Sequence, residues 1–186
     1  MATVREGSRS VLLVVDVQVG VVRNAWQVAD VVQRLVQAVA RARAQGVAVI
    51  WVQHQNERLV PGSADWQWVP ELVPAAAESR IAKRFNSAFE QTELEALLAG
   101  LGATRIVLAG AASNWCIRAT AHAALERGYD LTLLADAHTT TDMDCEDGTR
   151  IAAADIVREL NVAMTWLDYP GRHNSKALAE AVDFGG

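Results

Sequence analysis

Short apolar runs alternate along the chain with longer segments in which apolar residues recur at helical spacing. The run Val11–Val15 contains no polar residue, which is typical of a strand buried on both faces of a parallel sheet. Further strands are predicted at Val47–Val52, Arg80–Lys83, Ile106–Ala109, Leu131–Ala135 and Val162–Leu167. Trp51 and Trp166 fall within these strands, so we expect both indole rings in the core.

Helices are predicted between the strands. The first runs from Val28 to about Arg43 and stops before Gly46, a residue suited to a helix C-terminus. The others are predicted from Thr92 to near Gly100, from Trp115 to about Arg127 with Ser113 or Asn114 as N-cap, over Ile151–Leu160, and through Leu178 and Val182. The pattern is lost from Gln53 to Glu78, and a long loop inside a compact domain is usually functional.

The alternation of strands and helices places the chain in the α/β class, with a parallel sheet flanked by helices on both faces. At 186 residues the chain has the size of one domain, so we expect residues 1–186 to fold as a single unit. In such sheets ligands bind at the carboxyl ends of the strands, where the strand order reverses. Candidate functional residues should therefore directly follow strands.

The charge balance excludes two classes of partner. The chain has 17 Lys+Arg against 22 Asp+Glu, a net charge of −5 and no basic cluster, so we expect no binding to nucleic acid or to an anionic membrane. The first apolar run is too short for a secretory signal, and none is long enough for a membrane helix. Two cysteines do not make a disulfide framework. The sequence therefore predicts a soluble, cytoplasmic protein.

Three reactive side chains stand where functional groups are expected. Asp16 follows the first strand, Lys83 ends the third, and Cys116 lies where the fourth strand turns into a helix. Backbone N–H groups at a helix N-terminus are unpaired and favour negative charge, so a cysteine there beside a lysine is predicted to have a lowered pKa. Each residue also has an ordinary structural interpretation, as a buried thiol, a capping carboxylate or a solvated ammonium.

Three ordered motifs surround these residues: Leu13-Val-Val-Asp16-Val-Gln18, Ile81-Ala-Lys83-Arg-Phe-Asn-Ser87-Ala-Phe89, and Gly110-Ala-Ala-Ser-Asn-Trp-Cys116-Ile-Arg-Ala-Thr120. From about Val11 to Ala137 the chain resembles the isochorismatase-like cysteine hydrolase superfamily, which includes nicotinamidases, N-carbamoylsarcosine amidase, ureidoacrylate hydrolases and isochorismatases. The resemblance implies a three-layer α-β-α fold around a six-stranded parallel sheet in the Rossmann-like strand order 3-2-1-4-5-6.

The resemblance also implies a role for each residue. Asp16 would be the general base, Lys83 the cation and Cys116 the nucleophile of a catalytic triad. The family commonly has a cis peptide before the nucleophile, which here falls between Ala111 and Ala112. The backbone N–H groups of Ala112 and Cys116 would then form an oxyanion hole.

The chain departs from the family pattern at the metal site of nicotinamidases. Those proteins use an Asp-x-His pair after the second strand, and here Val52 replaces the aspartate and leaves His54 alone. We therefore expect no metal and no cofactor. The candidate pocket residues are Gln18, His54, Trp66, Trp68, Phe89 and Trp115. For Trp66 and Trp68 three roles stay open: a substrate lid, a subunit contact or plain packing.

By resemblance, the expected activity is metal-independent hydrolysis of a small amide, carbamoyl or ureide substrate through a Cys116 thioester. Some isochorismatases lack the cysteine, so its presence favours C–N cleavage over vinyl-ether hydrolysis. Two alternatives stay open: an isochorismatase-type reaction that relies on Asp16 as the acid, and a catalytically silent homologue that binds a metabolite. Family members are commonly dimers or tetramers, so we expect a homodimer or homotetramer.

Overall fold

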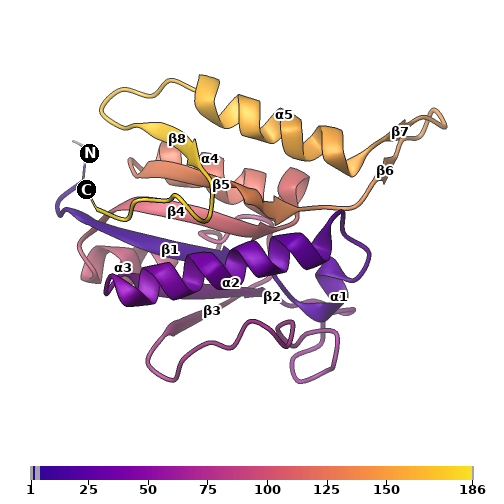
Figure 1. Ribbon diagram of the computed structural model, residues 1–186, viewed down its shortest axis with the longest axis horizontal. Coiled ribbons are helices and arrows are strands. Elements are labelled where there is room, and N and C mark those ends of the chain that lie inside the picture. The colour runs from indigo at the N-terminus through magenta and orange to yellow at the C-terminus, as the bar shows by residue number, and fades with distance from the viewer. Residues whose placement is uncertain (1, 3–4, 186) are drawn as a thin grey trace.

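The computed structural model describes Ala2 and residues 5–185 and contains a six-stranded parallel sheet. The strand order is β3-β2-β1-β4-β5-β8, which confirms the expected topology with the reversal between β1 and β4 (Figure 1). The strands are β1 (Arg9–Val15), β2 (Ala48–His54), β3 (Ser79–Lys83), β4 (Ala103–Ala111), β5 (Asp130–Thr139) and β8 (Asn174–Ala177). A separate two-stranded hairpin joins β6 (Met143–Asp144) to β7 (Arg150–Ile151).

Helices cover both faces of this sheet, as expected for a three-layer α/β fold (Figure 1). Their bounds are α1 (Val19–Val22), α2 (Val28–Ala44), α3 (Leu94–Gly100), α4 (Arg118–Glu126) and α5 (Ala153–Trp166). The long helix α2 packs on one face, while α3, α4 and α5 pack on the other. A short π-helical turn, η1 (Ser113–Ile117), leads directly into α4.

The burial of the central strand β1 explains why its residues from Val11 to Val15 are all apolar. Leu13 belongs to the core cluster under α3, α4 and α5, whereas Leu12 and Val14 belong to the cluster under α2. All three side chains are fully buried. Because successive side chains on a strand point to opposite faces, a strand covered on both sides needs apolar residues at every position.

The sixth strand lies elsewhere than the sequence predicted. Residues 162–167 are not a strand, because all but Leu167 belong to the last two turns of α5. Leu160 and Met164 are buried four residues apart, whereas Trp166 is 83% exposed and does not lie in the core. The true edge strand β8 is short and largely polar, so it carries no apolar pattern to recognise.

The predicted C-terminal helix through Leu178 and Val182 is also wrong. The chain after β8 forms turns without a helix up to Phe184. Ala179, Val182 and Phe184 are buried against the α2 face of the core. The spacing of these apolar residues is compatible both with one face of a helix and with an irregular segment packed on the core, so the sequence pattern was ambiguous.

The expected long loop lies between β2 and β3, and Glu78 fastens its end. This carboxylate accepts hydrogen bonds from Arg43 at 2.7 and 2.8 Å, from Trp51 Nε1 at 2.7 Å and from the Ala75 N–H at 2.7 Å. Arg43 lies on α2 and Trp51 on β2, so one carboxylate ties loop, helix and strand together. These contacts lower the pKa of Glu78 to about 2.

No helix within the described part of the chain has the length and apolar character needed to cross a membrane.

Replacing Glu78 with glutamine should lower the free energy of unfolding by about 1–3 kcal/mol at neutral pH, because the charged acceptor is lost. The pKa of Glu78 is lower in the folded chain than its ordinary 4.5. Its stabilisation is therefore present above that value and is lost as the pH falls towards about 2. Urea unfolding of the parent and of the Glu78→Gln variant, at neutral and at acidic pH, measures how the difference between their free energies of unfolding shrinks as the pH falls.

The matched control is Glu71→Gln, which alters an exposed carboxylate in the same loop. An equal loss of stability in both variants would contradict the special role of Glu78.

Candidate active site

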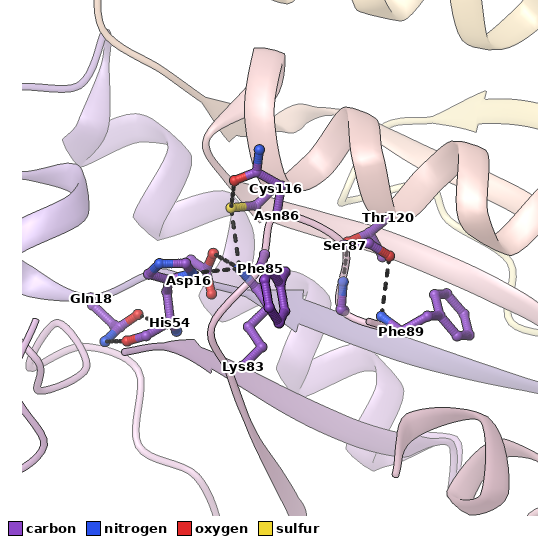
Figure 2. A network of polar contacts seen from close by, with 11 residues as sticks. Asp16, Gln18, His54, Lys83, Phe85, Asn86, Ser87, Phe89, Cys116 and Thr120 are labelled. Atoms are coloured by element: carbon purple, nitrogen blue, oxygen red, sulfur yellow. Dashed lines mark hydrogen bonds and ion pairs between the residues drawn. The ribbon is translucent and has the colours of Figure 1, made fainter. Parts of the chain in front are cut away.

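The three residues singled out from the sequence meet at the carboxyl end of the sheet (Figure 2). Asp16 follows the last residue of β1, Lys83 is the last residue of β3, and Cys116 lies in η1. Lys83 Nζ lies 2.6 Å from Asp16 Oδ2 and 3.1 Å from Cys116 Sγ. The nearest two, Lys83 and Cys116, are 33 residues apart in sequence, but parallel strands bring their ends to one edge.

Lys83 is the hub of this cluster. Its ammonium donates hydrogen bonds to Cys116 Sγ at 3.1 Å, to His54 Nδ1 at 3.1 Å and to the Phe85 carbonyl at 3.2 Å. The side chain is fully buried, as is that of Asp16. A buried ammonium is tolerated only when it is paired and hydrogen-bonded, and Lys83 meets both conditions.

Asp16 is held in an unusual backbone conformation. Its φ of +53° lies in the left-handed region, which aspartate tolerates better than most residues. Its N–H still donates to the Val52 carbonyl at 2.8 Å, so the residue extends the sheet before the chain turns. Its Oδ2 lies 2.6 Å from the Lys83 ammonium, which is the charged partner of the carboxylate. Burial raises the pKa of Asp16, and the Lys83 charge opposes that shift.

The turn that carries Cys116 is set by Gly110 and Ala112. Gly110 has a φ of +127°, and a Cβ there would lie 2.0 Å from the Val15 carbonyl oxygen, so only glycine fits. The peptide between Ala111 and Ala112 is cis, as the resemblance implied. The helical segment begins earlier than expected, with Ala112 rather than Ser113 or Asn114 at the N-cap position.

Ser113 has another use. Its hydroxyl is hydrogen-bonded to His138 Nδ1 at 2.8 Å, and His138 Nε2 pairs with Asn161 at 3.2 Å. Burial lowers the pKa of His138 to about 4, so this imidazole is neutral and serves to anchor the turn.

The electrostatics correct the expectation of a lowered cysteine pKa. Burial of the thiol and the negative charge of Asp16 raise the pKa of Cys116 to about 12, against the opposing effect of Lys83. The sequence correctly placed a lysine near the sulfur, but it gave no measure of how deeply the site is buried. The resting thiol is therefore protonated, and a thiolate requires an acceptor for its proton.

His54 joins the cluster as a neutral acceptor. Burial and the charge of Lys83 lower its pKa, and Nδ1 must be unprotonated to receive the Lys83 hydrogen bond. Asp16, His54 and Cys116 each offer one potential metal-ligand atom, and these atoms lie within 4.8 Å of one another. The Lys83 ammonium already contacts all three residues, so it takes the place that a metal cation would need.

Three candidate pocket residues make packing or hydrogen-bond contacts within the fold. Gln18 is fully buried and bonds through its side-chain amide to the backbone of His54 and Trp66. Phe89 lies in the core beside Tyr129, with ring centroids 5.9 Å apart. Trp68 is half-buried and packs edge-on against Trp51, with ring centroids 5.2 Å apart.

The remaining pocket candidates lie closer to the chemistry or to solvent. Trp115, the residue before Cys116, is 54% exposed. The Trp66 carbonyl accepts hydrogen bonds from the side chains of Gln18 and Gln53.

Sequence reasoning missed Phe85 and Asn86. The Phe85 carbonyl holds Lys83, and Asn86 Oδ1 lies 4.0 Å from the sulfur. Their position within three residues of Lys83 was the available signal.

Comparison with known proteins gives a consistent result. The profile of the isochorismatase domain matches residues 10–165. A streptothricin hydrolase of Streptomyces noursei is 35% identical over 163 residues, which cover 83% of this chain and 55% of that protein. A ureidoacrylate amidohydrolase of Methylorubrum extorquens is 29% identical over 139 residues, covering 58% of this chain and 56% of that protein. The chain thus spans little more than half the length of these relatives.

Solved structures show the same fold. The crystal structure of an isochorismatase from Pseudomonas putida superposes with a TM-score of 0.84 at 25% identity and covers 94% of this chain and 90% of that one. N-carbamoylsarcosine amidase from Thermoplasma acidophilum superposes with a TM-score of 0.72 at 20% identity, covering 94% and 99%.

The Asp16→Asn variant should react faster with iodoacetamide at Cys116 than the parent at neutral pH. The Asp16 charge raises the pKa of the thiol, so its removal lowers that pKa while Lys83 remains. Each unit of decrease raises the thiolate fraction about tenfold. Mass spectrometry in a Cys145→Ser background follows the single thiol, because Cys145 is the other free cysteine.

The matched control is Asp136→Asn, whose carboxylate pairs with Arg34 away from the sulfur. Unchanged or slower labelling of the Asp16→Asn variant would contradict the assigned electrostatics.

Proposed function

Because this chain belongs to the isochorismatase family, we propose that it is a cysteine hydrolase that cleaves the C–N bond of a small amide, carbamoyl or ureide substrate. The observation that carries the proposal is the contact of one buried ammonium with both a carboxylate and a thiol, at 2.6 and 3.1 Å. This combination supplies a nucleophile, a proton acceptor and a fixed positive charge, the parts that covalent acyl transfer needs.

The first half-reaction would begin with a protonated thiol. Asp16 accepts the Cys116 proton as the sulfur attacks the substrate carbonyl, and a C–S bond forms. The raised pKa values of both groups favour transfer during attack over a preformed thiolate. The carbonyl electrons move to oxygen, where the N–H groups of Ala112 and Cys116 would hold the oxyanion. Asp16 then returns the proton to the leaving nitrogen as the C–N bond breaks.

The second half-reaction would hydrolyse the thioester. Asp16 takes a proton from water as the water oxygen attacks the acyl carbon, and the C–S bond breaks. The sulfur leaves as a thiolate and recovers its proton from Asp16. Lys83 stays charged throughout and stabilises whichever partner carries the negative charge, since it contacts both.

The name of one relative, a ureidoacrylate amidohydrolase, supports a C–N substrate. The alignment with this amidohydrolase covers 58% of the chain, and the alignment with a streptothricin hydrolase covers 83% of it. Both are longer than the region they share with it, so their substrates come to this chain only as candidates.

The Cys116→Ala variant should lose at least about 10⁴-fold in turnover while it keeps its fold, because covalent catalysis is removed and the side chain stays small. With a slow substrate, the parent protein should accumulate a species heavier by one acyl group, visible by mass spectrometry. Ammonia release across small amides, carbamoyl compounds and ureides gives the activity.

Retention of most activity by Cys116→Ala would reject the nucleophile and favour the isochorismatase-type reaction with Asp16 as acid. Absence of turnover by the parent on the whole panel would favour a metabolite-binding homologue.

The pH dependence follows from the base. Asp16 must be ionised to accept the thiol proton, and its pKa is raised above the ordinary 3.8. The ratio kcat/KM should therefore rise with pH along an acidic limb whose midpoint lies above that value. Protonation of His54 would place a second cation beside Lys83 and should steepen the same limb. A kcat/KM that stays constant from weakly acidic to neutral pH, together with rapid formation of the acyl-enzyme, would contradict the role of Asp16 as the base.

A further inference from the structure

A buried chain of hydrogen bonds links helix α5 to the turn that carries Cys116. The Ser113 hydroxyl lies 2.8 Å from His138 Nδ1, and His138 Nε2 lies 3.2 Å from Asn161 Oδ1. Asn161 Nδ2 in turn donates to the Ala135 carbonyl at 2.9 Å. Ser113 begins η1, His138 lies on β5 and Asn161 lies on α5, so the chain of hydrogen bonds joins three elements.

The direction of each bond follows from the Ala135 carbonyl, which can only accept. The amide nitrogen of Asn161 must therefore face it, and the amide oxygen faces His138 as an acceptor. His138 Nε2 then carries a proton. Burial lowers the pKa of His138 to about 4, so at neutral pH the ring has a single N–H and Nδ1 is left as an acceptor. The Ser113 hydroxyl donates to Nδ1, which fixes its orientation.

The end of β5 also holds the next residue of the turn. The Thr140 hydroxyl donates to Asn114 Oδ1 at 2.7 Å. Ser113 and Asn114 are consecutive and come shortly before Cys116 in the same short turn. Ser113 is fully buried, and a buried polar group that is bonded keeps one geometry, because the alternative is to lose its partner. The sulfur is therefore held by β5 and α5 through the turn, and by Lys83 through the direct contact at 3.1 Å.

We propose that His138 and Asn161 are positioning residues of the hydrolase, which hold η1 so that the Cys116 sulfur and the oxyanion-binding N–H groups face the substrate carbonyl together. This inference rests on the proposed function. Within the described chain the side-chain hydrogen bonds of both residues reach Ser113 and Ala135, and none reaches a member of the triad. The two residues therefore act only through the turn. A displacement of about 1 Å at the reacting atoms costs about 100-fold in rate, so such a hold matters for turnover.

A cavity of about 480 Å³ leads from the surface to both residues. His138 and Asn161 line it together with residues of α2, among them Val31. Trp26 and Asp30 also line the cavity and are exposed, so it opens to solvent. The His138→Ala variant adds the volume of an imidazole ring to this cavity. Free imidazole can therefore enter and take the place of the missing side chain.

The kinetic test uses the fastest substrate of the amide, carbamoyl and ureide panel. The His138→Ala variant should lose about 10- to 100-fold in kcat while KM changes less than about threefold, because the turn is released and the pocket walls are kept. Imidazole, added at a mildly alkaline pH where it is neutral, should raise the kcat of this variant at least about threefold.

Two variants and the parent are the controls. Ser113→Ala should show a similar loss of kcat without rescue, because the hydroxyl that bonds to the ring is missing. His173→Ala should leave kcat unchanged, since this side chain makes no hydrogen bond within the described chain and immediately precedes β8 at the opposite end of the sheet. The parent with imidazole measures any direct attack of imidazole on the thioester.

Nuclear magnetic resonance of isotope-labelled histidines tests the hydrogen-bond chain without a substrate. The parent should show His138 as the neutral tautomer protonated at Nε2, with Nδ1 as the acceptor. The signal is assigned by its loss in the His138→Ala variant.

An unchanged kcat in His138→Ala or Ser113→Ala, a loss confined to KM, a gain from imidazole no larger than that of the parent, or a His138 tautomer protonated at Nδ1 would overturn the proposal. If circular dichroism shows that His138→Ala does not fold, the kcat of Ser113→Ala, which lacks a single hydroxyl, decides instead. Failure of the proposed function has a different readout, because it is the absence of ammonia release by the parent. The tautomer then decides by itself whether His138 and Asn161 hold the turn.

Discussion

The active site depends on the burial of one ammonium group. Lys83 has no exposed side-chain surface, and an isolated charge in such a place would cost several kcal/mol. The structure offsets this cost with the Asp16 carboxylate and with acceptors from His54, Phe85 and Cys116. These partners come from four segments, so the ammonium can be satisfied only when the ends of β1, β2 and β3 and the turn after β4 are in register.

The same burial determines the state of the Cys116 thiol. A buried site disfavours a second negative charge, so the Asp16 carboxylate and the thiol compete for the stabilisation that one ammonium offers. The Cys116 thiol is protonated at rest, because burial and the Asp16 charge raise its pKa to about 12. In the proposed mechanism its proton therefore passes to Asp16 as the sulfur attacks.

The ends of β2 and β3 lie side by side at one edge of the sheet, where His54 pairs with Lys83 in the strand register. His54 Nδ1 lies 3.1 Å from Lys83 Nζ, so the two strand ends also meet through their side chains. Glu78 fixes the end of the intervening loop to α2 and β2. A rigid sheet edge thus positions the reactive groups, and the loop between β2 and β3 is anchored to it.

Apolar periodicity was sufficient to predict the five longer strands of the sheet and α2. Burial of a strand or of one helix face requires apolar residues at a regular spacing, and that spacing is visible in the sequence. It was insufficient for β8, whose polar edge residues carry no such pattern, and for Val162–Leu167, whose apolar residues suit a helix as well as a strand. The sequence also placed Asp16, Lys83 and Cys116 at strand ends, where parallel topology brings them together. The pKa of Cys116 and the contacts of Gln18, Phe89 and Trp68 were decided by the tertiary structure alone. Both follow from burial and from distances between remote segments, and no local pattern encodes those quantities.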